Sequence, residues 1–269
     1  MFRFGAARGL LREGCRQIIR WAGASALQHR LQALHARLLS RWLLRKSGQP
    51  LIVNRQPAIV FSPHQDDETL GCGGLIALKR DLGAPVKVVF LTDGRGSHDG
   101  DTRARPAELV EIRRREALSA LAILGVSASD VHFLDHRDGA LRSMPFAQRQ
   151  RLVEQLAQLL NSFSPAEVYV PHRGDRHEDH EAAFELARAA LLRSGLGAKL
   201  FQYPIWMLWK APLFCDLRLR EIKGACRIDI RPAQDRKRRA IEAYRSQYLP
   251  RAFLERFRGP YEIYFKHET

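Results

Sequence analysis

From residue 51 onward, short runs of apolar and β-branched residues alternate with longer stretches in which apolar residues recur every three or four positions. The short runs predict β-strands at 58–61, 86–91, 131–134, 167–170 and 199–203. The longer stretches predict helices at 70–82, 107–124, 146–163 and 180–192. Because strands and helices alternate, we expect an α/β fold with a mostly parallel sheet covered by helices on both faces.

Residues 1–50 follow a different pattern, which predicts a basic amphipathic helical extension ahead of a main domain at 51–269. Arginines recur between the apolar positions of this extension, at Arg30, Arg37, Arg41 and Arg45. A shorter basic helix is expected before residue 23, and residues 47–50 read as a linker. The apolar stripe of the main helix consists of Leu27, Leu31, Leu34, Leu38, Trp42 and Leu43.

The net charge of +15 is concentrated in this extension. Residues 1–50 contain nine arginines and Lys46 against one acid, Glu13, so they carry +9 and leave +6 for the remaining 219 residues. The main domain is therefore only mildly basic, and we expect no nucleic-acid partner for it. A basic helix with a Leu/Trp stripe suits an anionic membrane surface, or alternatively packs its stripe on the domain.

The sequence favours a cytoplasmic protein that is at most peripheral on a membrane. Its four cysteines are widely separated, which gives no disulfide framework and makes a reducing compartment the default. No apolar run approaches the length of a spanning helix, and scattered arginines do not fit a secretory signal. An organellar transit peptide has a similar Arg-rich, acid-poor composition and stays an alternative for the N-terminus.

Histidines and acids follow the predicted strands at one edge of the sheet. The first strand runs into Pro-His-Gln-Asp-Asp-Glu at 63–68, the second into Thr-Asp-Gly at 92–94, and the fourth into Pro-His at 171–172 and His-Glu-Asp-His at 177–180. Carboxyl ends of parallel strands meet at one edge, where ligands bind. Imidazole and carboxylate suit zinc or another divalent first-row metal, and a catalytic zinc takes three protein ligands. The pattern therefore favours a metal site.

Simpler explanations exist for the single motifs. Asp66 or Asp67 could cap the helix that follows them, but two His/Asp clusters at one sheet edge favour the metal site over this reading. Gly71, Gly73 and Gly74 have the wrong spacing for a nucleotide-binding loop, so we expect them to allow close helix packing.

The segments AIVFSPHQDDETLGCGG and HEDHEAA resemble the two signature motifs of the PIG-L/LmbE-like zinc-dependent de-N-acetylases. The stretches LTDGRG, RRREALSALAILGV and RKRRAIEAYRSQY agree with the same family, so the resemblance spans roughly residues 55–265. Gln65 and Glu178 replace the usual proline of each motif, but neither position supplies a ligand in the family pattern. The resemblance implies a Rossmann-like fold.

The resemblance also implies a role for each site residue. Asp66 would be the general base that takes a proton from a zinc-activated water. His177 would stabilise the oxyanion and protonate the departing amine, with Asp179 as its orienting partner. Arg113 would face the substrate, although a solvated arginine is an equal alternative. The implied metal ligands are His64, Asp67 and His180.

We therefore expect a zinc-dependent N-deacetylase, a hydrolase that removes acetyl from an N-acetylated amino sugar in an N-acetylglucosamine-type glycoconjugate, which could be lipid-linked. The first alternative is the same chemistry on another amide, such as an acylated natural product or a thiol glycoside. The second is a non-catalytic α/β module that binds membrane or nucleic acid through its basic arm. The presence of both a candidate base and a candidate acid disfavours the second alternative.

Overall fold

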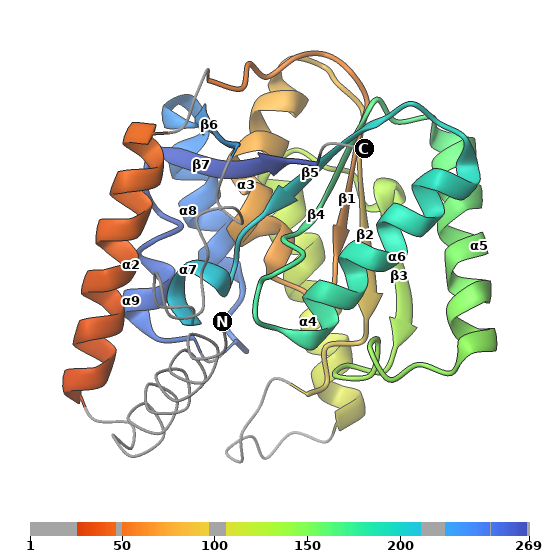
Figure 1. The fold of residues 1–269 in the computed structure, drawn as a ribbon, viewed down its shortest axis with the longest axis horizontal. Helices are drawn as coiled ribbons and strands as arrows, with labels where there is room; N and C mark the ends of the chain where they lie inside the picture. The colour runs from red at the N-terminus through yellow and green to blue at the C-terminus, as the bar shows by residue number, and fades with distance from the viewer. Residues whose placement is uncertain (1–25, 47–49, 97–105, 211–223, 248, 268–269) are drawn as a thin grey trace, which may run out of the picture.

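A computed structural model describes residues 26–46, 50–96, 106–210, 224–247 and 249–267 (Figure 1). Its centre is a seven-stranded sheet with the order β3-β2-β1-β4-β5-β7-β6. The strands are β1 (Ala58–Ser62), β2 (Val86–Thr92), β3 (Val131–His136), β4 (Glu167–Pro171), β5 (Lys199–Tyr203), β6 (Ala225–Asp229) and β7 (Tyr261–Lys266). Neighbours among the first five strands pair in parallel, whereas β7 is antiparallel to both β5 and β6. The predicted α/β fold with a mostly parallel sheet is confirmed.

Helices cover both faces of this sheet (Figure 1). One face carries α3 (Asp67–Asp81), α4 (Pro106–Ile123) and α8 (Gln234–Ala243). The other face carries α5 (Phe146–Phe163) and α6 (Glu178–Ser194). The shorter elements are α7 (Met207–Lys210), α9 (Arg251–Leu254) and the 3-10 turns Ala128–Asp130 and Arg231–Ala233.

The central strand β1 shows why the parallel strands appear in the sequence as uninterrupted apolar runs. All five of its residues are buried. Ala58 and Val60 belong to the core under α3, α4 and α8, whereas Ile59 and Phe61 belong to the core under α5 and α6. Successive side chains point to opposite faces, so a strand covered on both sides needs apolar residues at every position.

A buried ion pair fastens the C-terminal elements to α3. Lys237 of α8 lies 2.6 Å from Glu262 of β7, and both side chains are about 2% exposed. The carboxylate of Glu262 also accepts hydrogen bonds from the backbone N–H groups of Gly74 (2.7 Å) and Leu75 (2.9 Å). The pair is thus charge-balanced and hydrogen-bonded, as a buried pair must be. It fixes the position of the segment that follows α8.

The helix α2 (Ala26–Lys46) packs on α7 and on β6 at the edge of the sheet (Figure 1). Its contact face consists of Ala36, Leu39 and Leu43, all buried. This face differs from the predicted stripe, of which only Leu43 is buried among the described side chains, because a neighbouring face of the helix meets the domain. The predicted helix before residue 23 and most of the 47–50 linker lie outside the described residues. No described helix is both long and apolar enough to cross a membrane.

Two glycines of α3 have the packing role that their spacing predicted. A Cβ atom on Gly71 would lie 2.2 Å from a ring carbon of Tyr203, and one on Gly74 would lie 2.5 Å from a methyl carbon of Ile230. Both distances are far below van der Waals contact. The two glycines let α3 approach the sheet and the turn that precedes α8.

Replacing Gly71 with alanine is expected to destabilise the protein by about 1–3 kcal/mol, the usual cost of overpacking a core. The ring of Tyr203 cannot easily move aside, because its hydroxyl donates to the backbone carbonyl of Phe61 at 2.8 Å. Thermal unfolding should show a melting temperature lower by several degrees. The matched control is Gly197→Ala, since a Cβ there would meet no atom within 4 Å. Equal stability of both variants would contradict the packing role.

Candidate metal centre

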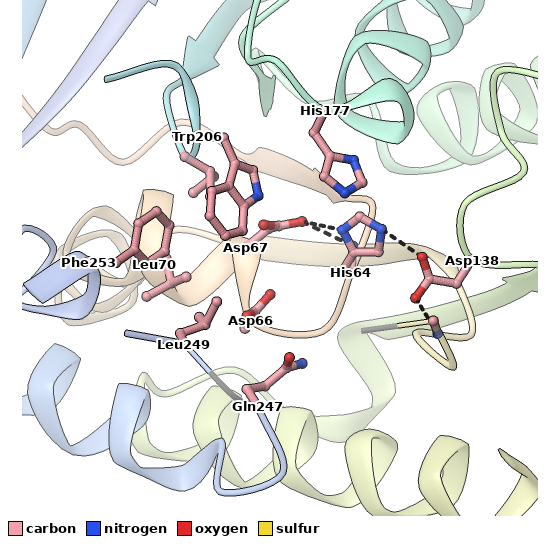
Figure 2. A pocket seen from close by; sticks show the side chains of 12 residues that line it. His64, Asp66, Asp67, Leu70, Asp138, His177, Trp206, Gln247, Leu249 and Phe253 are labelled. Carbon is pink, nitrogen blue, oxygen red and sulfur yellow. Dashed lines mark hydrogen bonds and ion pairs between the residues drawn. The ribbon is translucent and has the colours of Figure 1, made fainter. Parts of the chain in front are cut away.

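Hydrogen bonds of the Ser62 hydroxyl hold the loop between β1 and α3. The hydroxyl of Ser62 donates to the carbonyl of His64 at 2.7 Å and accepts from the backbone N–H of Glu68 at 3.2 Å. Asp66 precedes α3 with a φ of 143°, a conformation rarely adopted by residues other than glycine. Its side chain makes no capping hydrogen bond to α3 and instead lines a cavity, as Figure 2 shows.

Three side chains from the two predicted clusters meet at one point. The Oδ2 atom of Asp67 lies 3.2 Å from Nδ1 of His64 and 3.1 Å from Nε2 of His180. The two imidazole nitrogens lie 3.3 Å apart. Ligands about 2.0–2.1 Å from a tetrahedral metal are separated by roughly 3.3 Å, so these spacings and this donor set suit a divalent ion. The structure therefore brings together the residues expected to bind metal.

A third imidazole lies beside this point, and two more carboxylates contact Nε2, the other ring nitrogen of His64. The ring of His177 lies 4.9 Å from that of His64 and 4.6 Å from that of His180. Among the residues that the structure describes, two further groups of side chains have ligand atoms within 4.8 Å of one another, and both include His64. They are His64 with His177 and His180, and His64 with Asp138 and Asp179.

Asp175 fixes the orientation of His180. The Oδ2 atom of Asp175 lies 2.7 Å from Nδ1 of His180, and both side chains are fully buried. The same carboxylate accepts hydrogen bonds from the backbone N–H groups of Ile205, Trp206 and Met207. A carboxylate on one ring nitrogen leaves the other available to a metal, which is the usual arrangement for ligating histidines.

The pKa values of the two adjacent aspartates are shifted in opposite directions. Burial and the charge of Asp67 raise the pKa of Asp66 well above its usual range. Burial also tends to raise the pKa of Asp67, but the charge of His180 and hydrogen bonds from both imidazoles outweigh it and hold this pKa well below the usual range. One carboxylate is thus kept ionised while its neighbour has a greater affinity for protons.

Asp138 is a site residue that the sequence analysis missed. It follows β3 and places Oδ1 at 3.1 Å from Nε2 of His64, while its Oδ2 accepts from the backbone N–H of Gly96 at 2.8 Å. The first, second and fourth strands were searched for polar residues at their carboxyl ends, where ligands bind. The same search on the third strand would have found Asp138, which lies just beyond its carboxyl end.

Asp179 joins α6 to the loop that follows β3. One of its oxygens lies 3.2 Å from Nε2 of His64 and accepts from the backbone N–H of Gly139 at 2.7 Å. The other oxygen accepts from the backbone N–H of Leu141 at 3.0 Å. These contacts orient His64, and the expected role of Asp179 toward His177 stays a prediction.

Arg113 is fully buried and lies behind the cavity wall rather than in solvent. It donates to the backbone carbonyl of Gly94 and, at 3.2 Å, to Oε1 of Gln247. Gln247 lines the cavity and donates to the backbone carbonyl of Gln65 at 2.6 Å. Arg113 thus supports a residue of the wall, and its direct contact with substrate stays a prediction.

The cavity has a volume of about 230 Å³ and two chemically different sides. The first side is polar and contains His64, Asp66, Asp67, Asp138, His177 and Gln247. Figure 2 shows apolar side chains grouped on the other side, around Trp206 and Phe253. The apolar lining consists of Leu70, Ile205, Trp206, Leu249 and Phe253.

An α/β domain with histidines and aspartates clustered at the strand ends is typical of metal-dependent hydrolases. Residues 59–191 match the sequence model of a family described as PIG-L, GlcNAc-PI de-N-acetylase. The chain belongs to the PIG-L/LmbE-like family, as its motifs implied. His64, Asp66, Asp67, Asp138, His177 and His180 all lie inside the matched region.

One relative is a 1D-myo-inositol 2-acetamido-2-deoxy-alpha-D-glucopyranoside deacetylase from Mycobacterium sp. (strain KMS), 35% identical over 166 residues. The match covers 54% of this chain and 53% of that protein, so the chain spans about half the length of this curated relative.

Two solved structures have a similar fold. The N,N'-diacetylchitobiose deacetylase from Pyrococcus horikoshii has a TM-score of 0.60 at 24% identity, covering 82% of this chain and 80% of that one. The 4-carboxy-2-hydroxymuconate hydratase GalB from Pseudomonas putida has a TM-score of 0.59 at 24% identity, covering 75% and 82%. Since one is a deacetylase and the other a hydratase, the shared fold alone does not specify the reaction.

Proposed function

We propose that this protein is a zinc-dependent N-deacetylase that hydrolyses the acetamide of an N-acetylated amino sugar. The observation that carries the proposal is the convergence of ligand atoms from His64, Asp67 and His180 at mutual distances of 3.1–3.3 Å. Asp66 and His177 line the cavity beside them. A binding module needs neither of these two groups, whereas hydrolysis of an amide needs both a base and an acid.

His64, Asp67 and His180 would hold the ion, and their nitrogen and oxygen donors suit zinc or another divalent first-row metal. The ion, when bound, supplies polarisation of the amide carbonyl and makes a water molecule more acidic. Asp175 keeps the ring of His180 turned toward the ligand set through its 2.7 Å contact with Nδ1. Asp138 and Asp179 do the same for His64.

Asp66 would take a proton from the attacking water, because it is the cavity carboxylate outside the ligand set whose pKa burial raises. The water oxygen adds to the carbonyl carbon, and the C–N bond then breaks to give acetate and a free amine. His177 would stabilise the oxyanion and donate the proton that the amine nitrogen needs in order to leave. Asp179, two residues further on, would orient His177.

The two-sided cavity supports a sugar substrate. Its polar side offers donors and acceptors to hydroxyl groups, and its apolar side offers the ring of Trp206 to the carbon face of a sugar and room for a methyl group. The mycobacterial relative is named for an acetamido-glucopyranoside, and the structurally similar Pyrococcus enzyme for diacetylchitobiose. An N-acetylglucosamine-type glycoconjugate fits both names. A lipid-linked form, with the enzyme peripheral on the cytoplasmic side of a membrane, extends the same proposal.

The test is a panel of amides in which acetate and free amine are both measured. We expect turnover of N-acetylglucosaminides, loss of activity with a chelator, and recovery when zinc is returned. N-acetyl amino acids and acylated thiol glycosides belong in the same panel. Release of acetate from these compounds but from no N-acetyl sugar would favour the other-amide alternative. A metal-loaded protein that hydrolyses none of them would contradict the proposed activity.

A further inference from the structure

The outward face of α2 exposes a row of large apolar side chains. Leu31, Leu34, Leu38 and Trp42 are 58%, 54%, 59% and 38% exposed. Their spacing of three and four residues places them on one side of the helix, apart from the buried face of Ala36, Leu39 and Leu43. We call these four exposed residues the α2 stripe. Single exposed leucines are common on proteins, but a continuous row marks an interaction surface.

The charges beside the α2 stripe are all positive. Each of Arg37, Arg41 and Arg45 is exposed and follows a member of the stripe by three residues, so the arginines form a parallel row on the adjacent side of the helix. The 21 residues of α2 contain no aspartate or glutamate. The surface therefore combines apolar side chains with cations that no acid of the same helix neutralises.

The helix that carries the α2 stripe packs, through its buried face, on the element that follows the apolar wall of the cavity. Leu39 of α2 packs in a cluster with Met207 and Leu208 of α7, which directly follow the wall residue Trp206. The ring of Trp206 stacks on Phe253 of the same wall at 4.4 Å. Figure 1 shows α2 running beside α7. The helix α2 is thus anchored to the segment that forms much of the apolar wall.

We infer that the α2 stripe is a docking surface for an anionic lipid bilayer. Leucine and tryptophan side chains would enter the boundary between headgroups and acyl chains, while the row of arginines contacts anionic headgroups. A symmetric contact between two copies is disfavoured, because it would place two identical basic, acid-free helices against each other. The inference concerns a surface outside the cavity and stands without the proposed activity. Only the presentation of a lipid-linked sugar to the apolar wall rests on that activity.

The experiment measures sedimentation of the full chain with vesicles of phosphatidylcholine containing phosphatidylglycerol, and with vesicles of phosphatidylcholine alone. We expect binding to the anionic vesicles at low salt, weaker binding at high salt, and little binding to neutral vesicles. The variant carrying Leu34→Gln and Leu38→Gln should bind at least about tenfold more weakly, because two apolar side chains no longer enter the bilayer. Arg37→Gln with Arg41→Gln should also weaken binding and reduce its salt dependence.

The matched control carries Phe146→Gln and Leu192→Gln, which remove two side chains that are 76% and 65% exposed on α5 and α6. It should bind like the unmodified chain. The inference is overturned if the unmodified chain does not bind anionic vesicles at low salt. It is equally overturned if the leucine variant binds as well as the control, since residues 1–25 or another surface would then make the contact. Light scattering identifies the remaining case, a dimer that the leucine variant dissociates, and this result would replace the bilayer with a second copy. Deacetylation of a water-soluble substrate should be the same in all variants, so failure of the surface and failure of the activity are separable.

Discussion

Replacing Asp66 with asparagine is expected to lower kcat for deacetylation at least about a hundredfold while the protein keeps its metal. The carboxylate lines the cavity and lies outside the three converging ligand atoms, so its loss removes a proton acceptor and no ligand. Asparagine tolerates unusual backbone conformations better than most residues, and the φ of 143° at this position should therefore survive the change. Steady-state kinetics and metal analysis of the same preparation give the two required values.

The matched variant is Asp67→Asn, which changes the adjacent residue by the same atoms. It should lose metal, because its Oδ2 atom is the one that contacts both His64 and His180. If Asp66→Asn loses the metal and Asp67→Asn retains it, the assignments of base and ligand are reversed.

Replacing His180 with alanine is expected to remove most of the bound metal and, with it, activity. Three protein ligands leave little redundancy, so the loss of one imidazole should abolish stoichiometric binding. Asp175→Asn should have a smaller effect, a loss of about 10–100-fold in metal affinity, because it changes only the partner that orients the ring. Competition with a chromogenic chelator measures both affinities on one scale.

His132→Gln is the control for these two variants, because His132 lies near the start of β3, at the opposite end of the strand from the site. It should bind metal like the unmodified protein. Full metal content in His180→Ala would remove this residue from the ligand set. An Asp175→Asn variant that binds as poorly as His180→Ala would mean that the orienting contact is indispensable for the site.

The parallel part of the fold was predictable because its signals are local. Each of β1 to β5 contains a predicted strand and extends it by two residues at most, and α5 has the predicted bounds. The sequence pattern predicted no strand after residue 203, but β6 and β7 lie there. Their antiparallel pairing depends on contacts with β5 and α3 that no local pattern reports.

The candidate site likewise contains some residues that were predictable from the sequence and others that were not. His64, Asp67 and His180 were predictable as neighbours because they follow strands whose carboxyl ends share one edge. Asp138 obeys the same rule and was overlooked. Gln247 and Phe253 had no such signal, since the buried pair of Lys237 and Glu262 and the antiparallel strands bring this segment to the cavity.

The histidines and aspartates of the cavity and most of its apolar lining come from different stretches of the chain. The histidines and aspartates lie within residues 59–191, whereas Ile205, Trp206, Gln247, Leu249 and Phe253 all lie beyond them. The candidate catalytic groups thus lie in one part of the chain, and most of the wall that would face a substrate lies in another. On the proposed function, we expect substitutions of the Trp206 or Phe253 side chain to change which amide the protein accepts while its metal content stays the same.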